Sequence, residues 1–340
     1  MAHELSIIGG KATMAFVGET PWHGLGQRLT ESAPIEQWAI EAGMSWQAAA
    51  APVHFTRTDG SQGSYGDKRV IYRTDTGAPL SVMGDTYKIV QPVECLEFFR
   101  DLIKGHGFKL HTAGVLNGGR KLWALAKNGH GGEIVKGDSV KQFLMLSTSL
   151  DGTAPTTAAF TQIRIVCANT LRMAHGALGA DAVRTRHRSE FDPVAVREQL
   201  GLADQSWQAF SDTAKALADT PISLEQSREI LRGIFGQPKV KTPADSAAAI
   251  TSQLMARVGV AKMIDVREQK SVARVLELFA GAGRGSLHPG VAGTRWGLLN
   301  AVTEHIDHEQ GRSDDTRLNS AWFGRGDGFK QEALRALVAA

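Results

Sequence analysis

The fold is decided by residues 109–166, which read KLHTAGVLNGGRKLWALAKNGHGGEIVKGDSVKQFLMLSTSLDGTAPTTAAFTQIRIV. Residues 112–115 and 121–127 have the character of two strands. Between them, Asn117 and Gly118 tolerate the positive φ angles that a tight hairpin requires. This stretch therefore predicts a β-hairpin.

The same stretch continues the sheet and then changes character. Residues 140–149 and 156–166 read as two more strands, joined by an Asp-Gly-Thr turn at 151–153. Residues 168–178 have helical spacing. Strands followed by a helix predict an antiparallel sheet that is covered by helices on one face.

The flanking sequence completes an α+β fold. Before the sheet we expect helices at 30–44 and 93–105 and short strands at 53–57, 68–73 and 80–82. After residue 190 the periodicity is helical, at residues 194–218, 223–235, 244–258, 265–280 and 294–309, with a closing helix from 330 to 338. We therefore predict a domain with a central antiparallel sheet over residues 1–190 and a mainly helical region, packed against it, over residues 191–340.

Composition describes a folded chain and little more. Hydrophobic residues make up 42% and charged residues 21%, which is enough apolar material for a core and too little charge for a disordered chain. The net charge of +3 is too small to indicate nucleic acid unless charges cluster locally. Cys95 and Cys167 lack metal or disulfide spacing, so we expect buried thiols. Without a signal peptide or an apolar span, the expected location is the bacterial cytoplasm.

Several separated segments resemble one known family. They are Pro21-Trp22-His23-Gly24-Leu25-Gly26, Tyr87-Lys88-Ile89-Val90-Gln91-Pro92, Ser149-Leu150-Asp151-Gly152-Thr153, Arg164-Ile165-Val166-Cys167-Ala168-Asn169-Thr170-Leu171 and Trp296-Gly297-Leu298-Leu299-Asn300-Ala301-Val302-Thr303-Glu304. Together with Gly118-Gly119-Arg120 and Ser320-Ala321-Trp322-Phe323-Gly324, they resemble the phage/plasmid-like family built on the bacterial domain of unknown function 932. This resemblance implies a mobile genetic element as the source and carries over no catalytic residues.

A cluster of arginines is the strongest candidate for a binding site. Between residues 163 and 188 stand Arg164, Arg172, Arg184, Arg186 and Arg188, against Asp181 as the one acidic residue. Guanidinium groups suit phosphate because they donate paired, charge-assisted hydrogen bonds. An ordinary solvated loop explains the same cluster about equally well.

The strand and helix order is similar, in topology alone, to the single-strand annealing proteins of phage recombination. If the strands pair as expected, Arg120, Lys121 and Lys141 line the same groove as the arginines. The sequence thus favours a protein that binds nucleic acid, above all single-stranded DNA, in phage or plasmid replication or recombination. We expect it to need no cofactor and to form a homo-oligomer.

Two other classes of function remain open. His305 and His308 lie three residues apart in Glu304-His305-Ile306-Asp307-His308-Glu309, so on a helix they share a face and a divalent metal could bind there. That reading predicts a metal-dependent nuclease-like enzyme, although a polar helix end is the simpler explanation. The other class is a protein-interaction factor, such as a host-takeover or anti-defence protein.

Two more motifs are better explained as structure than as chemistry. The stretch from Gly281 to Ser286 has neither the lysine of a phosphate-binding loop nor a preceding strand, so we expect a helix end followed by a loop. His23, between Trp22 and Gly24, has no assignable partner and reads as part of a tight loop.

Overall fold

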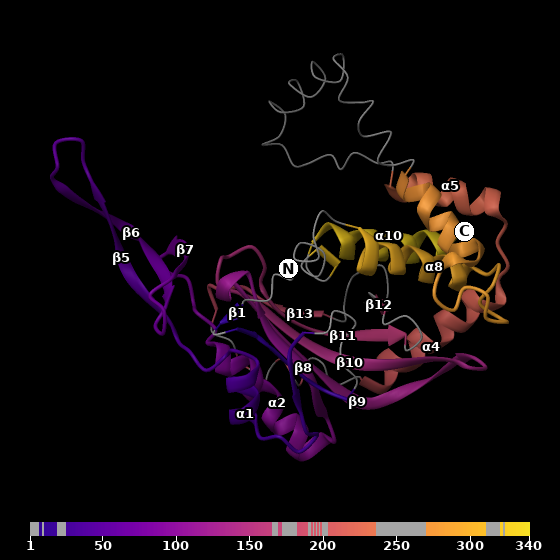
Figure 1. Cartoon of the computed structure of the whole chain (residues 1–340), viewed down its shortest axis with the longest axis horizontal. Coiled ribbons are helices and arrows are strands. Elements are labelled where there is room, and N and C mark those ends of the chain that lie inside the picture. The colour runs from indigo at the N-terminus through magenta and orange to yellow at the C-terminus, as the bar shows by residue number, and fades with distance from the viewer. Residues whose placement is uncertain are drawn as a thin grey trace, which may run out of the picture.

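The computed structural model describes residues 7–8, 10–18, 25–164, 169–171, 182–189, 192, 194, 196, 198, 203–235, 270–310, 320–321 and 324–340. Over these residues it confirms the α+β class. Strands dominate the N-terminal half, and helices follow them (Figure 1).

An eight-stranded sheet forms the centre of the molecule (Figure 1). Its strands are β3 (Met14–Val17), β4 (Gln27–Leu29), β8 (Lys109–Leu116), β9 (Lys121–Val135), β10 (Asp138–Ser149), β11 (Thr156–Arg164), β12 (Asn169–Leu171) and β13 (Ala182–Thr185). They follow the order β12-β11-β10-β9-β8-β3-β4, and β13 pairs with the other end of β11. Every pair is antiparallel except β3 with β4, so the predicted antiparallel sheet is confirmed with one parallel strand at its edge.

The predicted hairpin joins β8 to β9. Its turn η1 (Asn117–Gly119) has φ angles of 53° at Asn117, 70° at Gly118 and 112° at Gly119. Asparagine and glycine adopt these left-handed angles at low cost, which explains why this turn is placed where the sequence predicts it.

One element after the hairpins differs from the prediction. Residues 169–171, expected to be helical, form β12, which pairs antiparallel with Gln162–Arg164 of β11. The outer edge of β11 would otherwise present unpaired backbone groups, and β12 satisfies them. The rest of the expected helix lies outside the described residues. The predicted order of three strands and a helix is therefore wrong at this point.

Two sets of helices build two apolar cores. Helices α1 (Ile35–Glu41) and α2 (Pro92–His106) enclose the first core, and α4 (Ala203–Asp219), α5 (Leu224–Phe235), α8 (Arg295–Glu304) and α10 (Arg325–Ala339) enclose the second. Leu144 of β10 belongs to the first core and Val140 to the second. Residues four apart in a strand point to the same face, so both sets of helices cover one face at different ends of β10. We call it the core face, and its helical cover confirms the prediction.

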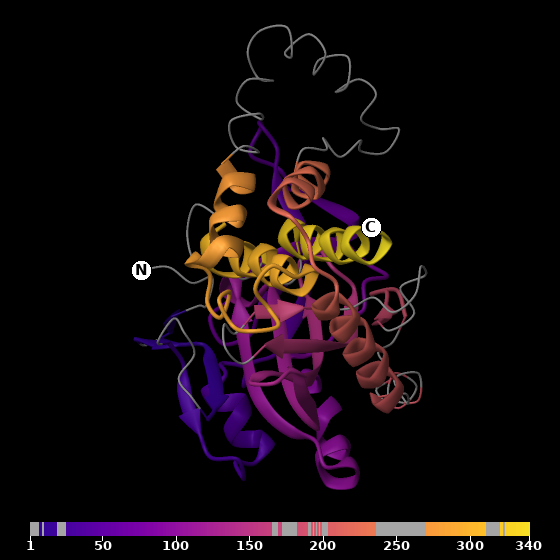
Figure 2. The same ribbon diagram turned by 90° about the vertical axis from the view of Figure 1, so that its right-hand side faces the viewer.

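The cores also bear on the predicted domain boundary. Val196, beyond residue 190, packs into the first core, while Ile134 and Val140 of the sheet pack into the second. In Figure 2 the C-terminal helices, orange and yellow, lie across one end of the sheet. The C-terminal region thus packs against the sheet as expected, whereas a division at residue 190 stays a prediction.

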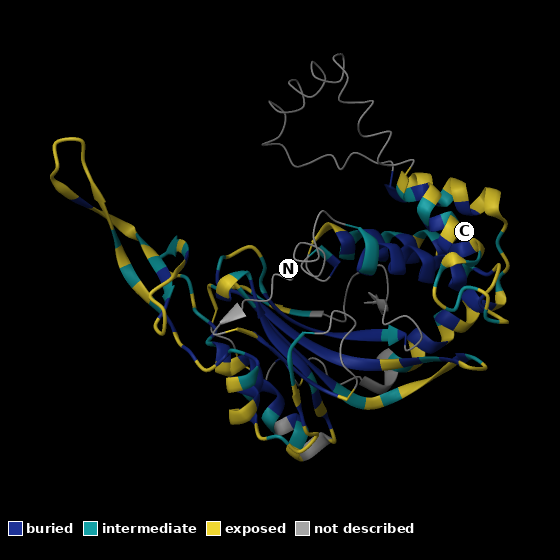
Figure 3. Cartoon of the chain, viewed as in Figure 1, coloured by how far each residue is buried: buried dark blue, intermediate teal, exposed yellow. Residues whose placement is uncertain are grey.

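A second, three-stranded sheet projects from the body of the molecule (Figure 1). It contains β5 (Ala48–Thr56), β6 (Gln62–Arg73) and β7 (Pro79–Gly84), and we call it the arm. Its distal part is exposed (Figure 3), including Phe55 at 45% and Tyr65 at 53%. A separate two-stranded ribbon, β1 (Ile7–Ile8) with β2 (Lys11–Ala12), precedes the main sheet.

Two C-terminal helices end in π-helical turns. A helix over residues 270–277 runs into η3 (Leu278–Ala282), and α8 runs into η4 (His305–Glu309). The predicted helices at 223–235 and 294–309 match α5 and the α8–η4 unit closely. The predicted helix at 244–258 lies outside the described residues.

A substitution at Gly297 tests how tightly α8 packs against the segment before it. A Cβ atom at this position would collide with the carbonyl oxygen of Val291, whereas nothing lies within 4 Å of a Cβ at Gly233 in α5. We expect Gly297→Ala to lower the free energy of unfolding by about 2 kcal/mol because the packed backbone must shift. Gly233→Ala should raise it by about 0.5–1 kcal/mol through helix propensity. Urea unfolding of both variants checks this, and similar gains in both would contradict it.

Candidate functional site

Arg164, a member of the predicted phosphate-binding cluster, lies inside the molecule. Its side chain is 3% exposed, and its Nε donates a hydrogen bond to Oδ1 of Asp138 at 2.6 Å. A second guanidinium nitrogen donates to the carbonyl oxygen of Arg284 at 3.2 Å. The cause is the register of β11, which places Arg164 opposite Val140 on the core face. The prediction that Arg164 faces phosphate is therefore wrong.

Asp138 is the residue that sequence reasoning missed. Its side chain is fully buried, and its Oδ2 accepts a hydrogen bond from the indole Nε1 of Trp296 at 2.8 Å. Arg164 and Trp296, from two of the segments that carry the family resemblance, thus meet at one carboxylate. The signal was weak, because Asp138 follows Lys136-Gly137 and reads as an ordinary turn residue. We call Asp138, Arg164 and Trp296 the buried junction.

The opposite face of the main sheet carries most of its cationic residues. Neighbours in the strand register share a face, and successive residues of a strand point to opposite faces. Because Leu144, Ala126 and Leu29 lie in the first core, the intervening positions point away from it. These positions are occupied by Arg28, Lys109, Lys121, Lys127, Lys141 and Arg184. We call this side the basic face.

The basic face includes three of the predicted site residues. Lys121, Lys141 and Arg184 lie on it, and Arg28, Lys109 and Lys127 join them. The last three could have been found only from strand register, because they are distant in sequence from the arginine cluster.

The other predicted residues lie apart from the basic face or beyond the described ranges. Arg186 and Arg188 are exposed in the loop after β13. Arg120 is exposed as well, and its Nε donates to the carbonyl oxygen of Leu80 in β7 at 3.0 Å, so it is turned toward the arm. Arg172 lies outside the described residues. The structure therefore gathers some of the predicted cations and separates others.

His187 anchors the loop that carries Arg186 and Arg188. Its ring nitrogens lie 3.2 Å from the carbonyl oxygen of Lys88 and 3.1 Å from that of Ala154, and its ring stacks on Tyr87 at 4.6 Å. The hydroxyl of Tyr87 donates to the carbonyl oxygen of Ser149 at 2.7 Å. Two more segments of the family resemblance thus hold this loop in place.

Aromatic side chains on the basic face are part of the packing. Phe16, Trp123 and Phe143 point to this side and are only 2–3% exposed, within a third apolar cluster. Buried rings cannot stack on bases. Trp123 is therefore an interior packing residue, and Trp322 and Phe323 lie outside the described residues.

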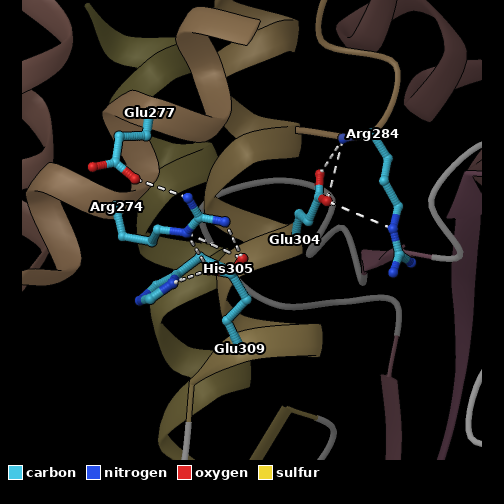
Figure 4. Close-up of polar contacts among 6 residues, drawn as sticks. All are labelled: Arg274, Glu277, Arg284, Glu304, His305 and Glu309. Atoms are coloured by element: carbon cyan, nitrogen blue, oxygen red, sulfur yellow. Dashed lines mark hydrogen bonds and ion pairs between the residues drawn. The ribbon is translucent and has the colours of Figure 1, made fainter. Parts of the chain in front are cut away.

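The candidate metal ligand His305 lies in a closed polar network (Figure 4). Its Nδ1 is 3.2 Å from Oε2 of Glu309, and its Nε2 is 3.3 Å from the hydroxyl of Ser271. Arg274 also binds Glu309, at 2.7 Å. Burial lowers the pKa of His305, although its contact with Glu309 acts in the opposite direction.

Within the described part of the chain, no set of metal ligands forms around His305. Among the residues that the structure describes, no group of three or more His, Cys, Asp and Glu side chains could hold a metal ion. His308 therefore belongs to no such group. The acidic residues Asp314 and Asp315 lie outside the described ranges. The histidine pair alone therefore does not make a metal site.

The loop after η3 holds a carboxylate and lacks the form of a phosphate cradle. The backbone N–H of Arg284 donates to Oε2 of Glu304 at 2.9 Å (Figure 4). Gly281, inside the π-helical turn, departs from helical geometry with a φ of 139°. The loop is the helix end that the sequence predicts, and Glu304 fixes it to α8.

Breaking the buried junction should lower the free energy of unfolding far more than breaking a surface ion pair. Asp138→Asn leaves the Arg164 guanidinium without its carboxylate, so we expect the free energy of unfolding to fall by about 3–5 kcal/mol. The double variant Asp138→Leu with Arg164→Met should lose less free energy of unfolding than the sum of the losses in Asp138→Leu alone and Arg164→Met alone. As a matched control, Glu36→Gln at the exposed pair with Arg100 should cost less than about 1 kcal/mol. Denaturant unfolding measures the loss in each variant, and equal losses at both pairs would refute the role of the junction.

The comparisons with known proteins leave the family as the one informative match. No helix of the described residues is both long and apolar enough to cross a membrane. No curated protein and no solved structure matches the chain. The profile of the family described as "Domain of unknown function (DUF932)" matches residues 79–322, which include β7 to β13, α4, α5, α8 and the buried junction. The chain belongs to the family of domain of unknown function 932.

Proposed function

We propose that this protein binds nucleic acid, preferably single-stranded DNA, along the basic face of its main sheet. The binding surface consists of Arg28, Lys109, Lys121, Lys127, Lys141 and Arg184, continued by Arg186 and Arg188 in the loop after β13. Such a protein would act in the bacterial cytoplasm, in phage or plasmid replication or recombination.

The observation that carries the proposal is the excess of positive charge on one face of the main sheet. The eight strands of the main sheet contain two acidic residues, Asp138 and Glu133. Asp138 binds Arg164 on the core face, whereas Glu133 pairs with Ser139 and therefore lies exposed on the basic face, near the end of the β9–β10 hairpin. Except for Arg164, every cationic residue of these strands points to the basic face. A one-sided surface of this kind attracts a polyanion.

The chemistry of this face favours contact with phosphate over contact with bases. Lysine and arginine neutralise the backbone without reading its sequence, and the aromatic rings of the face are buried. Binding should therefore tolerate many sequences and weaken steeply with salt. The buried rings also mean that the stacking used by many single-strand binders is absent from the described part of this face.

A protein-interaction role is the alternative, and the arm is the observation that favours it. Phe55, Tyr65 and Val82 are exposed there, at 45%, 53% and 55%. Exposed apolar side chains on a projecting sheet are typical of protein contacts, including contacts between copies in an oligomer. The nuclease alternative gains no support, because His305 is enclosed by Glu309 and Ser271.

Charge reversal on the basic face tests the proposal. Arg28→Glu, Lys141→Glu and Arg184→Glu change three exposed side chains in one variant. We expect it to bind a labelled single-stranded oligonucleotide at least tenfold more weakly in fluorescence anisotropy. Measured between about 50 and 200 mM salt, the slope of log affinity against log salt should fall by about 2, since each lost contact to a single strand removes about 0.7.

A second triple variant is the matched control. Lys215→Glu, Arg228→Glu and Arg232→Glu lie on α4 and α5, are equally exposed, and change the net charge by the same amount. Its affinity should stay within about threefold of the unaltered chain, since these charges lie away from the proposed contact. Equal losses in both variants would show that net charge alone matters. No loss in either would refute the proposed interface.

A further inference from the structure

Two irregularities of the sheet meet on the basic face and place an imidazole there. The β8–β9 register shifts between Leu110 and Thr112, and the β9–β10 register shifts between Lys141 and Phe143. Bulges of this kind redirect a side chain and are common beside functional sites. Here His111 of the first bulge packs against the ring of Phe143, with 5.0 Å between the ring centroids.

Two lysines, Lys127 and Lys141, act on this imidazole, and Lys109 neighbours Lys127 in the sheet. Lys127 pairs in register with both Phe143 and Lys109, and Lys141 is two residues before Phe143 on β10. Lys109 forms an ion pair with Glu31 at 2.8 Å, whereas Lys127 and Lys141 form none with the described residues. Like charges on neighbouring strands destabilise a sheet unless an anion compensates them. The cluster therefore has uncompensated positive charge.

The pKa values of two residues in the cluster are also lowered, in part by its positive charge. Burial, followed by the charges of Lys127 and Lys141, lowers the pKa of His111 to about 4. Burial and the neighbouring Lys141 and Lys109 lower the pKa of Lys127, with Glu31 opposing them. Lys127 and Lys141 are thus the charged groups that act on the ring, whereas Lys109 and Glu31 act on Lys127. Burial is the larger cause of both shifts, and the positive charge of the neighbouring lysines, which a bound anion would offset, adds to it.

Two polar atoms of the same bulge have no hydrogen-bond partner among the described residues. They are Nδ1 of His111 and the hydroxyl oxygen of Thr112, and both atoms are buried. Buried polar groups are nearly always paired, so unpaired ones indicate a missing ion, water or ligand. Nothing in the described part of the chain fixes the proton of the His111 ring, and the ring can present an N–H to a ligand.

We propose that His111, Lys127 and Lys141 form a binding site for a phosphate group, here called the bulge site. The two ammonium groups supply the charge and the imidazole supplies a hydrogen bond. The inference rests on the proposed function, in which the bulge site holds one phosphate of the bound strand. The same chemistry suits free inorganic phosphate, and the experiment separates the two sources.

NMR titration of the His111 ring in the full chain is the test, with His111→Gln to assign the signal. Without anion, the ring gains its proton only near pH 4. Inorganic phosphate is a monoanion in that range, as a phosphodiester is, and a bound anion favours the protonated ring. We therefore expect saturating phosphate at constant ionic strength to raise the pKa of His111 by about half a unit or more.

Two variants separate binding from structure. Lys127→Gln with Lys141→Gln should raise the pKa of His111 in the absence of phosphate, because two cations are gone. It should also raise the half-saturating phosphate concentration at least tenfold. The matched pair Lys68→Gln with Arg69→Gln removes two cations from the arm and should leave the phosphate response of His111 unchanged. An unaltered response in the first variant would overturn the site.

The same titration with an oligonucleotide distinguishes this inference from the proposed function. If the site holds a strand phosphate, a single-stranded oligonucleotide should shift the His111 signal in the same direction and compete with inorganic phosphate. A phosphate response without oligonucleotide binding would keep the bulge site and overturn the nucleic-acid proposal. Oligonucleotide binding with an unresponsive His111 would overturn the bulge site and leave the nucleic-acid proposal intact.

Discussion

The ion pair between Arg164 and Asp138 is the contact on which the arrangement of this molecule depends. A fully buried carboxylate is costly unless it is paired and hydrogen-bonded, and Asp138 receives both Arg164 and the indole of Trp296. Those partners come from β11 and α8, and Arg164 also binds the loop after η3 through the carbonyl of Arg284. One carboxylate thus joins the sheet to the C-terminal helices, which a purely apolar contact would do with less directional preference.

The position of this pair also determines which side chains remain exposed. A strand that buries one face cannot slip by one residue without turning every side chain to the wrong side. Because Arg164 lies on the core face opposite Val140, the next residue, Lys141, points to the basic face. The pairing of β10 with β9 places Lys127 on the basic face as well. The basic face is therefore a consequence of how the core face is packed. The buried junction is structural, yet it positions the surface on which the functional proposal rests.

The sequence predicted the elements that depend on local signals. Asn117-Gly118 predicts the hairpin, the apolar spacing of residues 93–105 predicts α2, and periodicity predicts the helices near 223–235 and 294–309. Register depends on the partner strand, so a single sequence does not determine it. For this reason the sequence predicts Arg164 among the exposed arginines and a helix that includes residues 169–171, although the open edge of β11 makes them a strand.

The same dependence explains why half of the basic face was missed. Arg28, Lys109 and Lys127 are isolated in sequence, and only the pairing of β3 with β4 and of β8 with β9 brings them to one side. Lys109 and Lys127 even stand directly opposite each other, an arrangement that costs stability by itself. The buried apolar cluster beneath them, including Phe16 and Phe143, holds the strands in register against that repulsion. A sheet that keeps such repulsion on one face is stabilised by any anion that binds the folded chain there, so binding and folding stability are coupled through these lysines.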